Sequence, residues 1–335
     1  MRAPVLLEVK DLHTQFPLSE GLVRAVDGVS LNIHRGETVG LVGESGCGKS
    51  VLARSILRIV PSPGTIASGQ ILYHRPVGSL SETVDLTTLD DDDAMLRFIR
   101  GLEIAMIFQE PASSLSPVYT IGQQIVEAIQ LHQPVSKQQA EQQAVEMLGK
   151  VGMPTPSRTV HRYPHQLSGG MCQRAMIALA LSCYPSLLIA DEPTTALDVT
   201  TEAQILELML NLQHEFGMAI LFITHNLGLI AQMTERVLVM YLGRIVEEAN
   251  VETLFYNPKH PYTQALLRSI PRLGPRDRNA RLYSIRGTVP EPYETPPGCP
   301  FHPRCDQMRP GVCDQQEPPW VTIVTGHRVR CVLYG

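Results

Sequence analysis

Hydrophobic positions alternate with polar ones near the start of the chain and form continuous runs further along. The alternation over residues 6–12 and 23–33 predicts two antiparallel strands. The continuous runs predict buried strands at residues 38–42, 104–108, 187–190 and 218–224. Further strands are predicted at residues 69–73, 237–241 and 244–246, the last two as a hairpin.

Helical periodicity fills the intervals between these strands. The predicted helices cover residues 49–60, 122–152, 171–182 and 201–216, and the second of them is interrupted near Pro134. Strands that alternate with helices predict an α/β fold, with a mostly parallel sheet covered by helices on both faces. The apolar positions alone therefore define the fold class.

Composition divides the chain near residue 257. A hydrophobic content of 44% over 335 residues is enough for more than one domain. Proline and glycine recur after residue 257, and long helical periodicity is lost after residue 270. We expect one domain over residues 1–256 and, over residues 257–335, a small loop-rich module that needs a stabilising link.

Charge and hydropathy narrow the classes of function. The net charge of −5 gives no overall basic signature for nucleic-acid binding. No apolar run approaches the length of a membrane span, and the N-terminus has no signal-peptide apolar region. We expect a cytosolic protein that is attached to a membrane only through a partner.

A glycine-rich stretch between a predicted strand and a predicted helix fits the pattern of a phosphate-binding loop. Its glycines let backbone N–H groups surround phosphate oxygens, and the helix N-terminus adds a positive dipole end. Lys49 should reach the β- and γ-phosphates, and the Ser50 hydroxyl should bind Mg²⁺. The helix N-terminus should also favour the thiolate form of Cys47. Nucleotide contacts are expected from Gly43, Glu44, Ser45, Gly46, Cys47, Gly48, Lys49, Ser50 and Val51.

Two further segments carry candidate chemistry. The apolar run 187–190 ends in Asp191, which is placed to hold Mg²⁺, and Glu192, a candidate general base for the attacking water. Upstream, Ser168, Gly169 and Gly170 open a helix and form a second candidate phosphate-binding surface. Alternatively, Ser168 only caps the helix and binds no phosphate.

Taken in order, these motifs resemble the ATP-binding subunit of an ABC transporter over residues 5–250. The resemblance implies a P-loop NTPase fold with a parallel-sheet core, an antiparallel β subdomain and a helical subdomain. It also implies a head-to-tail dimer in which Ser168, Gly169, Gly170 and Gln173 contact ATP on the partner's phosphate loop.

The same resemblance assigns several single residues. Gln109 matches the residue that senses Mg²⁺ and the membrane subunit, Asp198 one that crosses the dimer interface, and His225 one that steadies the γ-phosphate. The catalytic set is then Glu192, His225, Gln109 and Lys49, with Mg²⁺ held by Ser50, Gln109 and Asp191. Phe16 is a candidate for stacking on adenine, with ordinary packing as the alternative.

Three stretches, 105–111, 191–200 and 260–267, resemble the dipeptide and oligopeptide importer branch. This implies an ATPase at the inner face of the cell membrane that energises peptide uptake. Its partners would be a second, different ATPase subunit, two transmembrane permease subunits and an extracytoplasmic solute-binding protein. Nickel and opine importers share much of the pattern. A DNA-repair ATPase is the more distant alternative, but no coiled coil or DNA-binding insertion is visible.

Four cysteines crowd the C-terminal part of the chain in the pattern C-x5-C-x7-C-x17-C: Cys299, Cys305, Cys313 and Cys331. In a cytosolic chain such a cluster argues for metal before disulfides. The spacing is compatible with Zn²⁺, with an iron–sulfur cluster or with unligated thiols. The resemblance favours a structural [4Fe–4S] cluster, which would supply the stabilising link.

Overall fold

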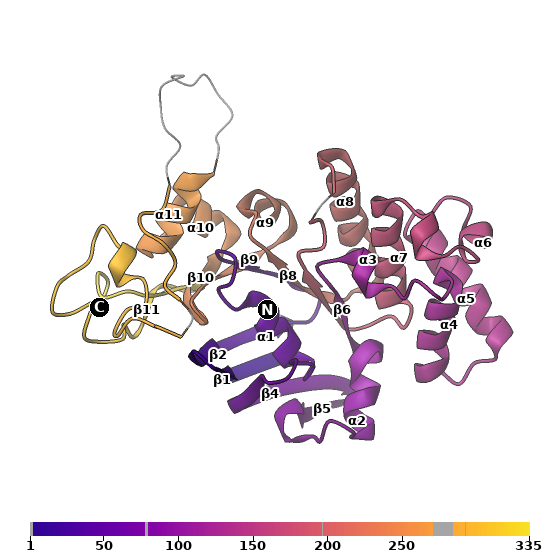
Figure 1. The fold of residues 1–335 in the computed structure, drawn as a ribbon, viewed down its shortest axis with the longest axis horizontal. Helices are drawn as coiled ribbons and strands as arrows, with labels where there is room; N and C mark the ends of the chain where they lie inside the picture. Colours follow the sequence, from indigo (N-terminus) through magenta and orange to yellow (C-terminus); the bar gives the residue numbers. More distant parts are fainter. Residues whose placement is uncertain (1–2, 78–79, 196, 271–283, 292) are drawn as a thin grey trace. The chain divides into compact units, whose positions relative to one another are not determined.

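The computed structural model describes residues 3–77, 80–195, 197–270, 284–291 and 293–335 (Figure 1). The chain forms two compact units, each assembled from separate stretches of sequence. The first unit comprises Met1–Glu8, Asn32–Thr38 and Leu72–Ile223. The second unit comprises Val9–Leu31, Val39–Ile71 and Thr224–Gly335.

The centre of the first unit is a parallel sheet in the order β6-β7-β8. Its strands are β6 (Ile104–Ile107), β7 (Leu187–Asp191) and β8 (Ala219–Thr224), and all their residues are buried. These are three of the four apolar runs in which the sequence predicts buried strands. Because Ile107 pairs with Ala190 and Asp191 pairs with Ile223, the three strands end at one edge of the sheet.

Helices make up most of the rest of the first unit. They are α2 (Ala94–Phe98), α3 (Pro111–Ser114), α4 (Ile121–His132), α5 (Lys137–Lys150), α6 (Pro156–Thr159), α7 (Gly169–Leu181) and α8 (Val199–Phe216). A short irregular turn, Ile99–Glu103, follows α2. The predicted helix 122–152 is thus two helices. Each begins with its own capping box, Thr120 with Gln123 and Ser136 with Gln139. Strands β4 (Thr65–Val77) and β5 (Leu80–Asp85) form an antiparallel hairpin.

The second unit surrounds the glycine-rich loop. Its first hairpin is formed by β1 (Val5–Leu18) and β2 (Gly21–His34), and the loop joins β3 (Thr38–Val42) to α1 (Lys49–Ile56). The later elements are α9 (Leu227–Met233), β9 (Arg236–Tyr241), β10 (Arg244–Asn250), α10 (Val251–Tyr256), α11 (Pro261–Ser269), β11 (Trp320–Val324) and β12 (His327–Arg330). Short 3₁₀ turns cover Leu86–Thr88 and Pro164–Gln166 in the first unit and His302–Arg304 in the second.

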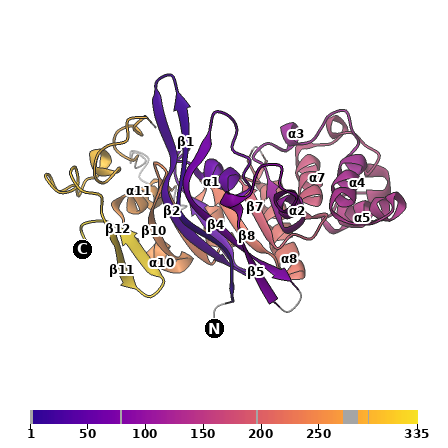
Figure 2. The ribbon, with the colours of Figure 1, turned by 90° about the horizontal axis from the view of Figure 1, so that it is seen from below.

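The sheet of the second unit has the order β11-β12-β10-β9-β3. Strand β3 runs parallel to β9, whereas β9, β10, β12 and β11 pair antiparallel. Figure 2 shows the C-terminal hairpin β11-β12 beside β10. The C-terminal segment is therefore joined to the nucleotide-loop unit by strand pairing, which the sequence pattern did not predict.

A buried carboxylate on β10 reinforces this joint. Glu247 is fully buried and accepts hydrogen bonds from the backbone N–H groups of Lys259 (2.6 Å) and His260 (2.9 Å). Nε2 of His327, on β12, lies 2.8 Å from Oε1 of the same carboxylate. A buried carboxylate needs such partners, so Glu247 fixes the starts of α11 and β12 against β10.

Candidate nucleotide-binding and hydrolysis site

The glycine-rich loop has the shape that a phosphate cradle requires. A Cβ atom at Gly43 would lie 2.2 Å from the carbonyl oxygen of Met240, and one at Gly48 would lie 2.0 Å from that of Ala25. Gly46, at φ +78°, faces open space. The backbone is therefore packed closely on one side and open on the other, as an anion-binding loop must be.

Lys49 begins α1 and lies across this loop. Its Nζ donates hydrogen bonds to the carbonyl oxygens of Gly43 (2.8 Å) and Glu44 (3.0 Å), and the residue is only 5% exposed. Ser50 and Val51 follow in the first turn of α1, and both are half-buried. The amine, the glycine backbone and the helix N-terminus together form a donor set that fits nucleotide phosphates.

Cys47 does not have the environment that the sequence suggested. Its side chain is buried, with Sγ 3.7 Å from Lys49 Nζ. Burial raises the pKa of the Cys47 thiol, and the nearby ammonium only partly opposes this. The prediction that the thiolate form of Cys47 is favoured was therefore wrong. The loss of solvent raises the pKa of the thiol by more than the Lys49 charge and the helix N-terminus lower it.

The carboxylates at the end of β7 lie in the first unit. Asp191 is 2% exposed, and Glu192 follows it with φ +47°, a left-handed conformation that non-glycine residues rarely adopt. Gln109 Nε2 donates a hydrogen bond to Glu192 Oε2 at 3.1 Å. The hydroxyl of Thr195 donates to the same oxygen at 3.0 Å. Gln109 and Glu192 are thus brought together, as the parallel pairing of β6 and β7 requires.

Sequence reasoning missed Thr195 as a partner of the carboxylate. A hydroxyl three residues after Glu192 was the available signal, because the turn that follows the strand brings the two side chains together. Ala196, in the same segment, lies outside the described residues.

The Ser168 segment is partly presented to solvent. Ser168 and Gly169 are exposed, and Ser168 Oγ caps α7 by accepting from Met171 N at 3.4 Å. A Cβ at Gly169 would meet no atom within 4 Å, whereas one at Gly170 would lie 2.8 Å from Thr201 Cγ2. Gln173 is 1% exposed, so its side chain does not reach the surface that Ser168 and Gly169 form.

Asp198 caps the next helix, α8. Its Oδ1 accepts from the backbone N–H groups of Thr200 (3.1 Å) and Thr201 (3.0 Å), and its Oδ2 accepts from the Thr201 hydroxyl (2.8 Å). These hydrogen bonds, those from Thr201 first, lower the pKa of the exposed Asp198 carboxyl. Its present function in the fold is that of a helix cap, and a role at a dimer interface stays a prediction.

Two further predicted residues lie in the second unit with the loop. His225 is exposed directly after β8. Phe16, on β1, packs its ring against Gly64, where an added Cβ would lie 2.4 Å from Phe16 Cε1. This contact is the ordinary-packing alternative for Phe16. Its stacking on adenine stays a prediction.

The iron–sulfur prediction is wrong. The four C-terminal cysteines line a cavity of about 10 Å³, which has room for about one water molecule. Among the described residues, which include all four, no group of three or more Cys, His, Asp or Glu side chains is arranged to hold a metal ion. Burial raises the pKa of the Cys299 thiol to about 12, and it raises those of Cys305 and Cys331. Burial thus disfavours the thiolate form of Cys299, Cys305 and Cys331, which is the form that binds metal, and Zn²⁺ is no better supported than the cluster.

Strand pairing and aromatic packing stabilise the C-terminal segment instead. Hairpin β11-β12 is paired with β10. The rings of Tyr241, Tyr262 and Phe301 lie with centroids 4.6 to 5.3 Å apart, a spacing typical of attractive aromatic contacts. The link that a loop-rich segment needs is present without metal.

The phosphate loop, the parallel strands and the carboxylate-ended strand define a P-loop ATPase. Comparison with known proteins identifies its family. Residues 26–195 match the ABC transporter family, and residues 246–313 match the family described as the oligopeptide/dipeptide transporter C-terminal region. The chain belongs to the ABC transporter family, as an ATP-binding, ATP-hydrolysing subunit. This confirms the resemblance given by the motifs.

Individual relatives agree with this assignment over almost the whole chain. The chain is 50% identical to the oligopeptide transport ATP-binding protein AppD of Bacillus subtilis, covering 98% of this chain and 97% of that protein. It is 46% identical to the dipeptide transport ATP-binding protein DppD of the same organism, with coverage of 98% and 94%. Among solved structures, the dimeric post-hydrolysis state of the ATP-binding cassette MJ0796, bound to ADP and Pi, matches with a TM-score of 0.61. The identity there is 28%, over 73% of this chain and 99% of that chain.

Proposed function

We propose that this chain hydrolyses ATP to drive the uptake of dipeptides and oligopeptides across the cell membrane. The observation that carries the proposal is similarity along nearly the full length of two peptide-transport ATP-binding proteins. The match of residues 246–313 to the family described as the oligopeptide/dipeptide transporter C-terminal region supports the same substrate class. We propose the domain division 1–256 and 257–335 from the change in composition near residue 257.

Each predicted site residue has a proposed role in hydrolysis. Lys49 and the backbone of the glycine-rich loop would bind the phosphates, and Ser50, Asp191 and Gln109 would hold Mg²⁺. The ion would neutralise phosphate charge as the bond to the γ-phosphate breaks. Glu192 would accept a proton from the attacking water. The hydrogen bonds from Gln109 and Thr195 would orient the Glu192 carboxylate for this role. His225 would steady the γ-phosphate.

The exposed Ser168 and Gly169 surface supports a site completed by a second subunit. An exposed helix N-terminus with backbone N–H groups is suited to phosphate on a facing chain. In the proposed head-to-tail arrangement, Ser168, Gly169 and Gly170 would face ATP held by the partner's loop, and Asp198 would lie near the interface. We propose that the partner is a second, different ATPase subunit.

The membrane partners would be two permease subunits, with a solute-binding protein outside the membrane. The described part of the chain contains no helix long and apolar enough to cross a membrane. Val118 and Tyr119, which follow Gln109, are 72% and 54% exposed, and such apolar exposure is typical of a contact surface. We propose that this segment docks on the permease at the inner face of the membrane.

The test is uptake of labelled solutes by cells that lack this chain. Cells restored with the wild-type chain should take up labelled di- and oligopeptides, and cells restored with Glu192→Gln should not. The matched control is ⁶³Ni²⁺ uptake in the same cells, which should be independent of the chain. Loss of nickel uptake with normal peptide uptake would contradict the peptide assignment and favour the nickel-importer alternative.

A further inference from the structure

The C-terminal segment 257–335, here called the extension, contacts the phosphate loop directly at Glu44. The Arg304 guanidinium donates two hydrogen bonds to the Glu44 carboxylate, Nη1 to Oε2 at 2.7 Å and Nη2 to Oε1 at 3.0 Å. The hydroxyl of Tyr262 accepts a hydrogen bond from the Glu44 backbone N–H at 2.9 Å. Side chain and backbone of one loop residue are thus both held by the extension.

Arg304 is itself fixed in place. Its side chain is 4% exposed, and its Nε donates to the carbonyl oxygen of Arg286 at 3.0 Å. Nη1 also lies 3.4 Å from the Tyr241 hydroxyl, and the guanidinium lies 6.0 Å from the centre of the Phe301 ring. A bidentate arginine–carboxylate pair with one nearly buried partner has little freedom to rearrange.

Glu44 transmits this restraint to the residue that would bind phosphate. Its carbonyl oxygen accepts from Lys49 Nζ at 3.0 Å, so the contacts run from Arg304 and Tyr262 through Glu44 to the amine. The hydrogen bonds of Glu44 to the extension fix the first half of the loop. Lys49 then lies over a backbone that is already ordered.

We propose that Arg304 and Tyr262 are positioning residues for the phosphate loop, so that the extension sets the affinity of this chain for MgATP. Ordering a loop before its ligand arrives removes an entropy cost from binding. The inference rests on the proposed ATPase function and adds to it a use for the extension. It assigns these side chains no contact with the nucleotide.

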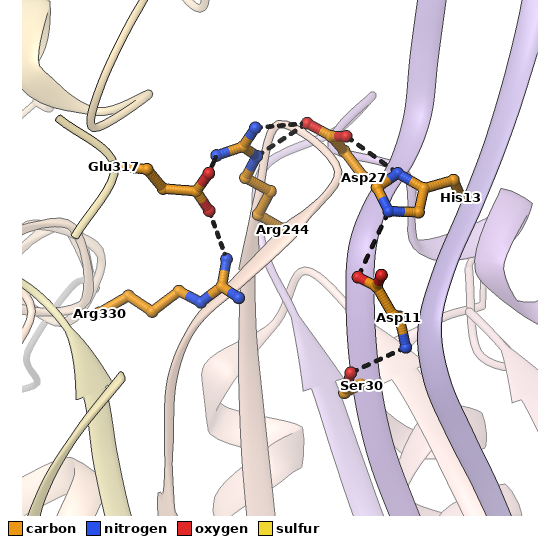
Figure 3. Close-up of polar contacts among 7 residues, drawn as sticks. All are labelled: Asp11, His13, Asp27, Ser30, Arg244, Glu317 and Arg330. Carbon is orange, nitrogen blue, oxygen red and sulfur yellow. Dashed lines mark hydrogen bonds and ion pairs between the residues drawn. The ribbon is translucent and has the colours of Figure 1, made fainter. Parts of the chain in front are cut away.

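A second contact of the extension provides a matched control (Figure 3). Arg330 donates to Glu317 at 2.8 Å, and Glu317 also pairs with Arg244, which binds Asp27. These charges connect the extension to β10 and β2 and include no residue of the phosphate loop. Arg330→Met therefore removes an arginine ion pair of the extension and leaves Glu44 untouched.

The experiment is titration of the purified full-length chain with a fluorescent ATP analogue and Mg²⁺, together with KM and kcat for ATP. Arg304→Met should weaken nucleotide binding by roughly tenfold and raise KM by a similar factor, with a smaller change in kcat. Arg304→Lys keeps the positive charge but loses the paired donors of the guanidinium, so its nucleotide affinity should lie between those of the wild type and Arg304→Met. Tyr262→Phe should have a smaller effect in the same direction, and Arg330→Met should leave both constants unchanged.

A variant of Glu44, the partner of Arg304, tests whether misfolding of the extension causes the loss of nucleotide affinity. Glu44→Gln leaves the extension intact, and the double variant Glu44→Gln/Arg304→Met should bind no more weakly than the weaker single variant. Unchanged nucleotide affinity in folded Arg304→Met, or an equal loss in Arg330→Met, would overturn the inference. A wild-type chain that binds no MgATP would instead contradict the proposed function.

Discussion

Gln109 donates a hydrogen bond to Glu192 across the ends of two neighbouring strands, over 3.1 Å. The contact exists because β6 and β7 are parallel and in a register that ends them at the same edge. Two residues 83 positions apart in the chain therefore form one local arrangement. Any movement of the segment after Gln109 that shifts this side chain would change the hydrogen bond to Glu192, the proposed general base. A change in that segment could therefore alter the rate of hydrolysis.

Glu192→Gln should retain MgATP binding and lose turnover, with kcat lowered by about 10² to 10⁴. The substitution removes the proton acceptor and keeps the size of the side chain. Steady-state ATPase assays and nucleotide titration measure the two effects separately. Glu207→Gln, on the exposed face of α8, is the control and should change neither. Undiminished turnover in Glu192→Gln would remove Glu192 from the mechanism.

Ser168→Arg should bind MgATP normally but fail to hydrolyse it. Ser168 is exposed at the start of α7, so a large cation there can be accommodated in this chain and would obstruct only a facing subunit. Ser168→Ala, which loses the capping bond and the proposed hydroxyl contact but adds no bulk, should cost about 1 kcal/mol of stability and retain more activity than Ser168→Arg. If folded Ser168→Arg lost nucleotide binding, the head-to-tail assignment would be untenable.

Cys47 should resist alkylation in the folded chain at neutral pH. The thiolate is the reactive form, and burial both raises the pKa of this thiol and hides the sulfur. Labelling by iodoacetamide, followed by mass spectrometry of the peptide that contains Cys47, should be slow at pH 7 and faster as the pH rises. The same chain in denaturant should react fully. Rapid labelling of the folded chain at pH 7 would show that the loop opens.

Local patterns predicted the nucleotide loop and its surroundings well. The strand 38–42 and the helix start at Lys49 are where the sequence placed them, because both depend on neighbours within a few residues. The end of that helix was less predictable. α1 ends at Ile56 and Arg58 adopts φ +56°, although apolar residues continue to Val60. Of the apolar residues that follow, Leu57 is buried but Ile59 is exposed, so the apolar run does not mark the extent of the helix.

Long-range relationships could not be predicted from local patterns. The pairing of β10 with β12 and the contact between Glu44 and Arg304 join residues about 80 and 260 positions apart. The cysteine pattern failed for a related reason. Its spacing records order along the chain, whereas a metal site requires several thiolates around one point with room for the ion. Loops bring the four thiols to one small cavity without providing that arrangement.

The last prediction concerns acid stability and rests on His260, at the start of α11. His260 is 1% exposed, its backbone N–H donates to Glu247 Oε2 at 2.9 Å, and its ring Nδ1 accepts from the backbone N–H of Tyr262 at 3.1 Å. Burial lowers the pKa of His260 from 6.5 to about 3. In the unfolded chain the imidazole titrates near its ordinary pKa of about 6.5.

Between these two pKa values the unfolded chain binds a proton that the folded chain excludes, so the folded state loses stability as the pH falls below 6.5 and stops losing it near pH 3. The expected slope is about 1.4 kcal/mol per pH unit, or about 2 kcal/mol lost at pH 5. His260→Asn keeps a side chain able to cap α11 and cannot titrate in this range. Urea unfolding at pH 7.5 and pH 5 should show the wild-type chain losing about 2 kcal/mol more than the variant. Equal losses in the two proteins would mean that His260 is protonated, or solvated, in the folded state.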